Sequence, residues 1–430
     1  MLNKVTSYIL TLIIVLFILV PKVSLAQLTP FVPDDPFFGY EPDTLPGSPG
    51  QWYFVNQAPE SLTIEVGVSN NVVKINAANV GLDSNVQGSW NKGLTGEGVV
   101  IGIVGLTGIA GDHPDLVENY REKLSKNFSQ DSSLADSPQG PQSDMDNHDT
   151  AVAGVSSARG GNGIGITGLA PFSGSAGLRV SNPTNEVTDD SNLNYRDAYY
   201  WASGVDIDGA INDLPDIQIK NHSYARVPPF IEENQMVIDG LNNTAKNNII
   251  HAFAAGNFRG SPNGDTNRMQ RNSLNSVITV AALGSDGIFA DYSNYGTSIF
   301  LTTPAARTDF TGFLILTLDR VDDLGFNPGN PEGIFDIFPD QNYTSIFNGT
   351  SATAPIVSGA MALAKQIQPH MCVRMAKHAL ATTCRVVDAD DKSETSFNGW
   401  VTNSAGNNFN PNYGFGNIDV NGFVEKVRDT

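Results

Sequence analysis

A serine flanked by small residues is the first candidate for chemistry in this chain. Ser351 lies in the run Gly-Thr-Ser-Ala-Thr-Ala-Pro at residues 349–355, and residues 352–365 predict a buried helix that starts just after it. A hydroxyl is a weak nucleophile at neutral pH, so catalysis would need a base within hydrogen-bonding distance and donors for the oxyanion that forms. The positive end of a helix suits such a serine. Helix capping is the alternative, because Ser and Thr are common N-cap residues.

Two other polar residues could supply the missing groups. His148 stands at the start of a second helix of small residues, predicted at residues 150–158, where it could act as a base. Asn257 follows a predicted buried strand at residues 249–255, and its side-chain amide could donate to an oxyanion. Each has an ordinary alternative: a single His is usually structural or exposed, and Asn after Gly is usually a turn residue. Together with Ser351 they indicate acyl-transfer chemistry.

The composition is that of a globular, acidic protein. The 430 residues include 42 Gly and 24 Pro, with 40% hydrophobic and 16% charged residues, which suits one large domain or two small ones. The net charge of −20 disfavours nucleic acid and anionic membrane surfaces as partners. Acidic side chains can supply oxygen ligands to calcium, although most of these acids are scattered and suit a solvated surface.

The N-terminus predicts a secretory signal peptide. Lys4 precedes an apolar run at residues 8–20, and small residues provide a cleavage site for the removal of residues 1–26. The run is too short to span a bilayer comfortably, so we expect a secreted protein, extracellular or periplasmic, without a stable membrane span. An uncleaved anchor is the alternative. Loss of Lys4 and Lys22 would leave 23 basic against 45 acidic residues, a net charge of about −22.

Apolar segments of strand type alternate with helical patterns along the chain. Strands are predicted at residues 99–104, 177–180, 217–221, 249–255 and 277–282, and helices at 150–158, 194–202 and 235–246. This alternation indicates an α/β fold with a mainly parallel sheet. Residues 27–50 predict an extended N-terminal arm, and residues 310–348 predict a long surface excursion rich in Gly, Pro and Asp.

The two cysteines, Cys372 and Cys384, flank a stretch with a helical pattern. A rise of about 1.5 Å per residue would hold them about 18 Å apart, whereas a disulfide needs Cα atoms within roughly 7 Å. We therefore expect two separate thiols, with a disulfide only if the helix breaks.

These stretches together resemble the subtilisin-like serine peptidases, and their flanks point to the kexin branch or its bacterial relatives. The resemblance covers residues 35–427 and includes four further motifs: Gln-Trp-Tyr at 51–53 with Asn56, residues 93–104, His-Pro-Asp-Leu at 113–116 and Tyr-Gly-Phe-Gly at 413–416. It implies a three-layer α/β fold with helices on both faces of the sheet, in a peptidase domain at residues 51–430. By the same resemblance Ser351 is the nucleophile, His148 the general base, and Asn257 an oxyanion donor beside the Ser351 amide.

The third member of the family's triad is missing from its usual place. The family has an Asp at the end of the first strand that holds the imidazole in the correct tautomer, and this chain has Gly105 or Leu106 there. Asp112 could replace it if the turn is remodelled. Asp149 replaces the family's Gly after the His, but neighbours on a helix point in different directions, so we expect it to orient His148 poorly.

A structural calcium ion is also implied by the resemblance. The Gly-rich stretch at residues 160–171 matches a loop in which one side-chain oxygen and several carbonyl groups converge on the ion. The implied ligands are the side chain of Asn162, the carbonyl groups of Gly160, Ile164 and Ile166, and the carboxylates of Asp115 and Asp35. Calcium takes about six to eight oxygens of this mixed kind. A Gly-rich loop without an ion is the alternative.

The expected partner is a polypeptide substrate that pairs with one strand. By the resemblance, main-chain hydrogen bonds from one edge hold the peptide, and that edge is formed by Asn221, Ser223, Tyr224 and Ala225. Kexin relatives follow this strand with acids that bind a basic residue, but Arg226 and Pro228 stand there. Glu232, Glu233 and Asp265 could substitute, so a dibasic preference is not established.

Two functions remain open. The first hypothesis is a secreted, monomeric serine endopeptidase that forms an acyl-enzyme on Ser351. The second is a weak or inactive pseudopeptidase of the same fold that binds peptides or serves as an interaction scaffold, because the triad Asp is replaced. A secreted esterase would need Gly-x-Ser-x-Gly, and residues 349–353 lack the second Gly.

Overall fold

A computed structural model describes residues 28–39, 50–56, 61–66, 71–76, 82–128, 140–144, 146–180, 190–224, 232–307, 314–329, 336 and 338–430. For residues 61–66, 71–76 and 190–191 it describes the backbone only. The predicted signal peptide, residues 1–26, lies outside the described residues. Within them, no helix has the length and apolar character needed to cross a membrane.

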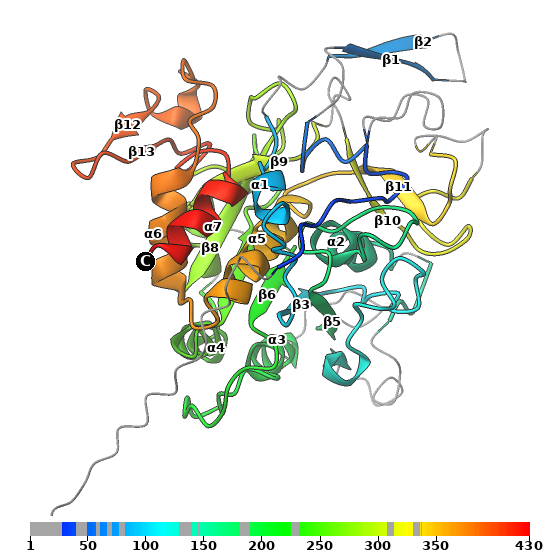
Figure 1. The fold of residues 1–430 in the computed structure, drawn as a ribbon. Coiled ribbons are helices and arrows are strands. Elements are labelled where there is room, and N and C mark those ends of the chain that lie inside the picture. The colour runs from blue at the N-terminus through cyan, green and yellow to red at the C-terminus, as the bar shows by residue number, and fades with distance from the viewer. Residues whose placement is uncertain are drawn as a thin grey trace, which may run out of the picture.

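The centre of the fold is a seven-stranded parallel sheet (Figure 1). Across the sheet the order is β4 (Lys126–Asn127), β5 (Gly174–Arg179), β3 (Val100–Gly105), β6 (Ile219–His222), β7 (Ile250–Ala254), β8 (Val277–Leu283) and β9 (Leu301–Pro304). Strand β3 lies inside the sheet, where Ile103 pairs with Gly177 on one side and Asn221 on the other. Strands β5 to β9 are buried along their whole length, as expected for a parallel sheet covered on both faces.

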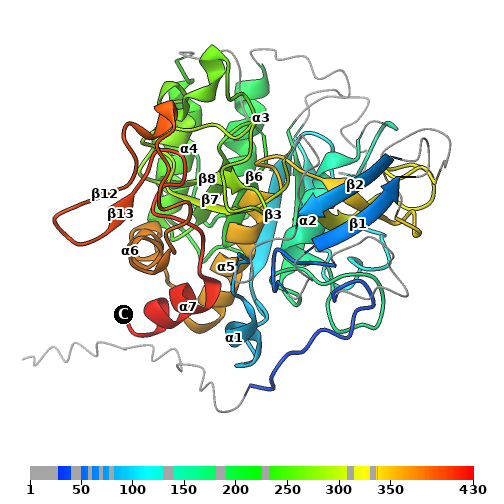
Figure 2. The same cartoon turned by 90° about the horizontal axis from the view of Figure 1, so that it is seen from above.

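Helices cover both faces of this sheet. Figure 2 shows α3 (Asp190–Tyr200) and α4 (Gln235–Lys246) on one side of strands β6 to β8, and α5 (Thr353–Ile367) on the other. Helix α2 (His148–Ser157) shares the α5 side, and its small residues pack in one core with those of α5. A small residue on α5 also allows close packing against the loop after α2, since an added Cβ on Gly359 would lie 2.8 Å from the Leu169 side chain. The predicted three-layer α/β fold is confirmed.

The C-terminal part adds two helices and a small hairpin. Helices α6 (Val373–Thr383) and α7 (Val420–Arg428) pack against each other, with the strand pair β12 (Val401–Thr402) and β13 (Asn408–Phe409) between them in sequence. Cys372 and Cys384 flank α6 and are free thiols. The prediction of two separate thiols is therefore confirmed.

Within residues 310–348 the structure describes two strands, and the burial of one of them differs from the predicted surface excursion. Strands β10 (Ile315–Leu318) and β11 (Tyr343–Phe347) form an antiparallel pair, and β10 is buried along its length. The Thr317 hydroxyl donates to the carbonyl of Ala151 in α2 at 2.7 Å. The two strands are short and are flanked by Gly, Pro and Asp, so the sequence pattern did not indicate them. This segment therefore supports the helix that begins at His148.

The described part of the N-terminal arm, residues 28–39, lies against the domain. The amide of Phe31 donates to the carbonyl of Trp90 at 2.8 Å, next to α1 (Gln87–Trp90). The two rings meet edge to face with centroids 5.5 Å apart. Further along the arm, Asp35 is buried against the glycine-rich loop. A separate antiparallel hairpin, β1 (Ser61–Val66) and β2 (Asn71–Asn76), follows in sequence.

Candidate active site

Ser351 lies in the turn that leads into α5. Its hydroxyl donates to the main-chain carbonyl of Ser223 at 3.2 Å, and the Ser223 hydroxyl donates to the Ser351 carbonyl at 2.9 Å. The N-cap of α5 is Ala352, without a side-chain capping bond. The capping alternative for Ser351 is therefore wrong, and the hydroxyl is held at the end of strand β6, where a peptide edge was predicted.

Asn257 and the Ser351 amide border one small space. The side-chain oxygen of Asn257, Oδ1, accepts from the amide and the hydroxyl of Thr350 at 2.9 and 2.8 Å. The side-chain NH₂ group therefore remains as a donor. A Cβ built on Gly349 would lie 2.8 Å from Asn257 Nδ2 and 3.6 Å from the Ser351 nitrogen. Gly349 itself has a φ of +87°, which favours glycine. The Asn257 amide nitrogen and the Ser351 main-chain nitrogen thus border the same point next to Gly349.

His148 is the first residue of α2, and its side chain is 33% exposed. Its Nδ1 lies 2.9 Å from Asp149 Oδ1, so the neutral ring donates from Nδ1 and keeps Nε2 as an acceptor. The ring also packs edge to face on Phe347, four residues before Ser351, with centroids 5.8 Å apart. Within the described residues no hydrogen bond joins His148 to Ser351, as is common before substrate binds.

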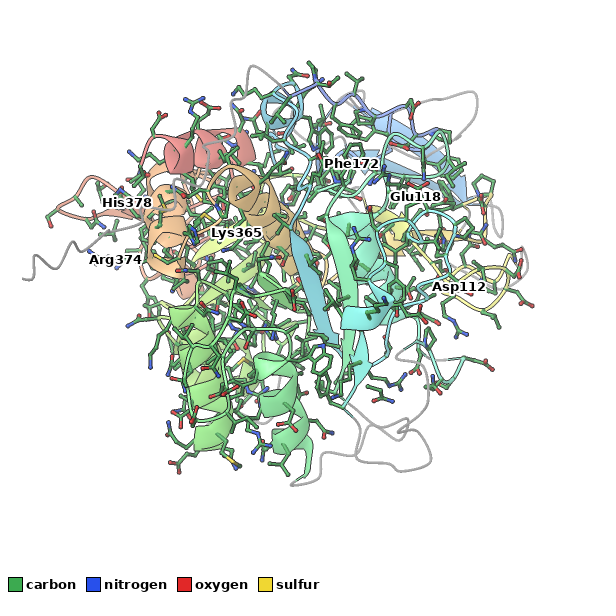
Figure 3. The ribbon with its side chains drawn as sticks, turned by 60° about the horizontal axis from the view of Figure 1, so that its bottom comes forward. Asp112, Glu118, Phe172, Lys365, Arg374 and His378 are labelled. Atoms are coloured by element: carbon green, nitrogen blue, oxygen red, sulfur yellow. The ribbon has the colours of Figure 1, made fainter. Side chains whose placement is uncertain are left out.

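The expectation that Asp149 would orient His148 poorly was wrong. Divergence of neighbouring side chains applies to the outer parts of long side chains, whereas Nδ1 is the ring nitrogen nearest the backbone and the Asp carboxylate is short. Asp112 does not take this place. It is exposed at the edge of the molecule (Figure 3), where its charge acts on His113.

The predicted peptide edge is partly described. Asn221 is buried in β6, donates to the Ser223 hydroxyl at 2.9 Å and accepts from Ser358 in α5 at 3.1 Å. Its side chain therefore ties β6 to α5, and Ser223 carries the contact to Ser351. Tyr224 turns inward, where its hydroxyl lies 3.0 Å from His222 Nδ1. Ala225, with Arg226 and Pro228, lies outside the described residues.

The comparison with known proteins agrees with this geometry, because residues 96–416 match the subtilase family. The chain belongs to the subtilase family. Among its relatives, the Aeromonas extracellular serine protease of Aeromonas sobria is 28% identical over 433 aligned residues, which cover 89% of this subtilase and 64% of that protein. The dibasic-processing endoprotease of Schizosaccharomyces pombe is 28% identical over 367 residues, covering 82% of this chain and 44% of that protein.

Solved structures give the same fold. A crystal structure of the serine protease of Aeromonas sobria superimposes with a TM-score of 0.71 at 25% identity, covering 90% of this subtilase and 68% of that chain. Fervidolysin of Fervidobacterium pennivorans, at 19% identity and a TM-score of 0.55, supports the fold alone. The subtilase spans less than two thirds of the length of the two relatives from Aeromonas sobria and Schizosaccharomyces pombe.

In this subtilase the residues of the predicted calcium site come together. Asp35 accepts from the Gly161 amide at 2.9 Å, and Asp115 accepts from the Asn162 side chain and the Ile166 amide, both at 2.8 Å. Burial raises the pKa of Asp35 to about 6, and burial together with the nearby charge of Asp35 raises the pKa of Asp115 to about 7. A bound cation would stabilise the ionised form of both carboxylates.

The donor set fits calcium in part. The carbonyl groups of Gly160, Ile164 and Ile166 accept none of the hydrogen bonds found within the described residues, so they are available as ligands. The side-chain oxygen of Asn162 accepts from the Ile164 amide at 3.1 Å. Among the described residues, no cluster of three or more His, Cys, Asp or Glu side chains exists. Main-chain oxygens would therefore complete the coordination, which suits calcium better than a transition metal.

Two of the three acids considered for a basic specificity pocket have partners within the protein. Glu233 pairs with Arg271 at 2.8 Å, and both side chains are about 95% buried. Asp265 caps a short 3₁₀ helix through the amide of Asn267, and Glu232 is exposed. Glu233 thus meets a positive charge of the protein itself, and its negative charge is not free for a substrate side chain.

Two aromatic residues of the site were missed in the sequence. Phe347 packs on the His148 ring, and the Tyr343 hydroxyl donates to Asp115 Oδ2 at 3.3 Å. Both belong to β11, inside the stretch that the composition marked as a surface excursion. An aromatic residue among Gly, Pro and Asp gives no signal of its own, so only the fold could place these rings.

Proposed function

We propose that this subtilase is a serine endopeptidase that hydrolyses peptide bonds through an acyl-enzyme on Ser351. The observation that carries the proposal is the pair of donors beside Gly349, formed by Asn257 Nδ2 and the Ser351 amide. Thr350 fixes the Asn257 side chain with two hydrogen bonds, so the donors are in place before a charge develops. Preorganised donors of this kind are usually the largest single contribution to acyl-transfer catalysis.

The reaction follows from the positions of three side chains. On substrate binding the Ser351 hydroxyl leaves the Ser223 carbonyl, gives its proton to His148 Nε2 and attacks the carbonyl carbon of the scissile bond. The negative oxygen of the tetrahedral intermediate accepts hydrogen bonds from the two donors beside Gly349. The proton then passes from His148 to the leaving amine, and water hydrolyses the acyl-enzyme by the same steps, with His148 again as base.

The peptide substrate is proposed to lie extended along the end of strand β6. The two hydrogen bonds between Ser223 and Ser351 support this proposal, because a strand edge can bind a peptide through its main chain whatever the side chains of that peptide. We include Ala225 in this edge by the family resemblance. A dibasic preference is not part of the proposal, because Glu233 is neutralised by Arg271.

Calcium and secretion complete the proposal. One relative is a calcium-dependent protease of Trichormus variabilis, 26% identical over 368 residues, and the buried pair Asp35 and Asp115 fits such an ion here. Two relatives carry the word extracellular in their names. We propose that the ion stabilises the loop at residues 160–166 and that the protein acts outside the cytoplasm as a monomer.

The test compares the full-length protein, produced in a secreting host with calcium, with its Ser351→Ala variant. Casein hydrolysis and covalent labelling by a fluorophosphonate are expected in the unmutated protein and absent in the variant. If the folded, unmutated protein shows neither, the peptidase proposal fails and a peptide-binding pseudopeptidase remains. Binding of casein peptides to the Ser351→Ala variant, measured by calorimetry, would then support that second function.

A further inference from the structure

The end of strand β3 has no room for a side chain, because another residue fills that space. A Cβ built on Gly105 would overlap the Cγ and both carboxylate oxygens of Asp149. Gly105 is the last residue of β3, an inner strand of the sheet, whereas Asp149 belongs to the first turn of α2. A carboxylate thus lies at the strand end, although the strand itself supplies none.

The Asp149 carboxylate is held by three hydrogen bonds from two directions. Oδ1 faces His148 Nδ1 at 2.9 Å, and Oδ2 accepts from the amides of Thr107 and Gly108 at 2.7 and 3.0 Å. The Asp149 amide in turn donates to the Thr107 hydroxyl at 2.9 Å. The side chain is 3% exposed, so these partners replace its water.

One oxygen therefore serves the imidazole while the other fixes the carboxylate in place. Gly108 has a φ of +74°, and this turn aims two successive amides at Oδ2. An acid in the first turn of a helix can serve simply to complement the helix dipole. Here, however, the carboxylate binds the His148 ring and the loop after β3, not the amides of its own helix.

We propose that Asp149 is the positioning residue for His148 and that it replaces, from the residue next to the histidine, a carboxylate on the strand end. This inference rests on the proposed function. Asp149 fixes the tautomer with Nε2 free and stabilises the imidazolium during proton transfer. Residue 105 must then be glycine, because Asp149 occupies the volume that any side chain there would need. The two positions form one steric and electrostatic unit.

The first experiment uses Asp149→Asn. Its amide oxygen can still accept from Thr107 and Gly108, so the loop stays anchored, while its NH₂ faces His148 Nδ1 and favours the wrong tautomer. We expect kcat to fall on the order of 10⁴-fold, as it does when the orienting Asp of a serine peptidase is altered. The acidic limb of the kcat/KM profile should also move to lower pH, because an anion beside the imidazole is lost.

The second experiment moves the carboxylate from the start of α2 to the end of strand β3. Asp149→Gly should lose as much activity as Asp149→Asn, and Gly105→Asp alone should destabilise the protein by overlap with Asp149. The double variant Gly105→Asp with Asp149→Gly should recover at least tenfold in kcat over Asp149→Gly. Recovery would support an exchange between the two positions.

Two results would overturn the inference while leaving the peptidase proposal intact. One is Asp149→Asn with kcat/KM within twofold of the unmutated protein and the same pH profile. The other is a loss of activity that follows only the loss of folded protein, as judged by circular dichroism, with the acidic limb unmoved. A failure of the peptidase proposal is separate, since it would appear as absent labelling of Ser351 in the unmutated protein.

Discussion

Thr350 holds the Asn257 side chain through two hydrogen bonds. The amide and the hydroxyl of Thr350 donate to Asn257 Oδ1 at 2.9 and 2.8 Å. The same hydroxyl accepts from the Gly256 amide at 3.0 Å. One residue next to the nucleophile thereby fixes both the donor and the strand end that carries it. The orientation of the proposed oxyanion donor therefore depends on the residue that precedes Ser351.

Thr350→Val should lower kcat by about tenfold with little change in KM. The isosteric valine removes one of two anchors, so Asn257 remains present but less fixed, and the cost stays below the roughly 10²- to 10³-fold expected for loss of the donor itself. Steady-state kinetics on a chromogenic peptide measure the effect. Thr350→Ser keeps the hydroxyl and serves as the control. Equal kinetics for both variants would contradict the anchoring role.

Gly349→Ala should abolish hydrolysis more severely than it lowers stability. The new methyl group would stand 2.8 Å from Asn257 Nδ2, in the space meant for the oxyanion, and a φ of +87° costs a non-glycine residue about 1–2 kcal/mol. We expect kcat to fall at least as far as in Asn257→Ala. Thermal unfolding monitors the stability cost. Gly260→Ala, at a φ of +84° with open space around it, is the matched control for backbone strain.

Calcium should stabilise the protein more at pH 8 than at pH 5. Without metal, Asp35 and Asp115 have pKa values of about 6 and about 7, above the ordinary 3.8. The folded state then binds more protons than the unfolded state between pH 4 and 7, so the contribution of this pair to stability falls as the pH rises through that window. Calcium binds the ionised carboxylates, so it should offset this loss of stability at higher pH.

Melting temperatures in EGTA and in excess calcium, at pH 5 and pH 8, test the calcium prediction. At a free calcium concentration of about 100 times the dissociation constant, the gain at pH 8 should be about 2.7 kcal/mol. In Asp115→Asn the calcium effect should be lost, and the fall in metal-free stability with pH should be smaller. A calcium shift of equal size at both pH values would argue against these two carboxylates as ligands.

The sequence was enough to predict the fold and to propose three catalytic groups, because each depends on local pattern. Buried strands read as apolar runs, and the residues around Ser351, His148 and Asn257 are constrained by close packing of α2 and α5. The role of Asp149 could not be read in this way, since it depends on a distance between a strand end and a helix start. Yet one sign was present: an acid is missing at residue 105 and an acid is gained next to the histidine.

Glu233→Gln should destabilise the protein without altering its preference among substrate side chains. Glu233 and Arg271 lie 2.8 Å apart and are almost fully buried, so removal of the negative charge leaves the guanidinium uncompensated, at a cost of roughly 3–5 kcal/mol. Urea unfolding measures this cost. The ratio of kcat/KM for peptides with Arg or Leu before the scissile bond should change less than twofold. A fall in that ratio of tenfold or more would mean that Glu233 faces the substrate, and the acid pocket of the kexin branch would then survive here in altered form.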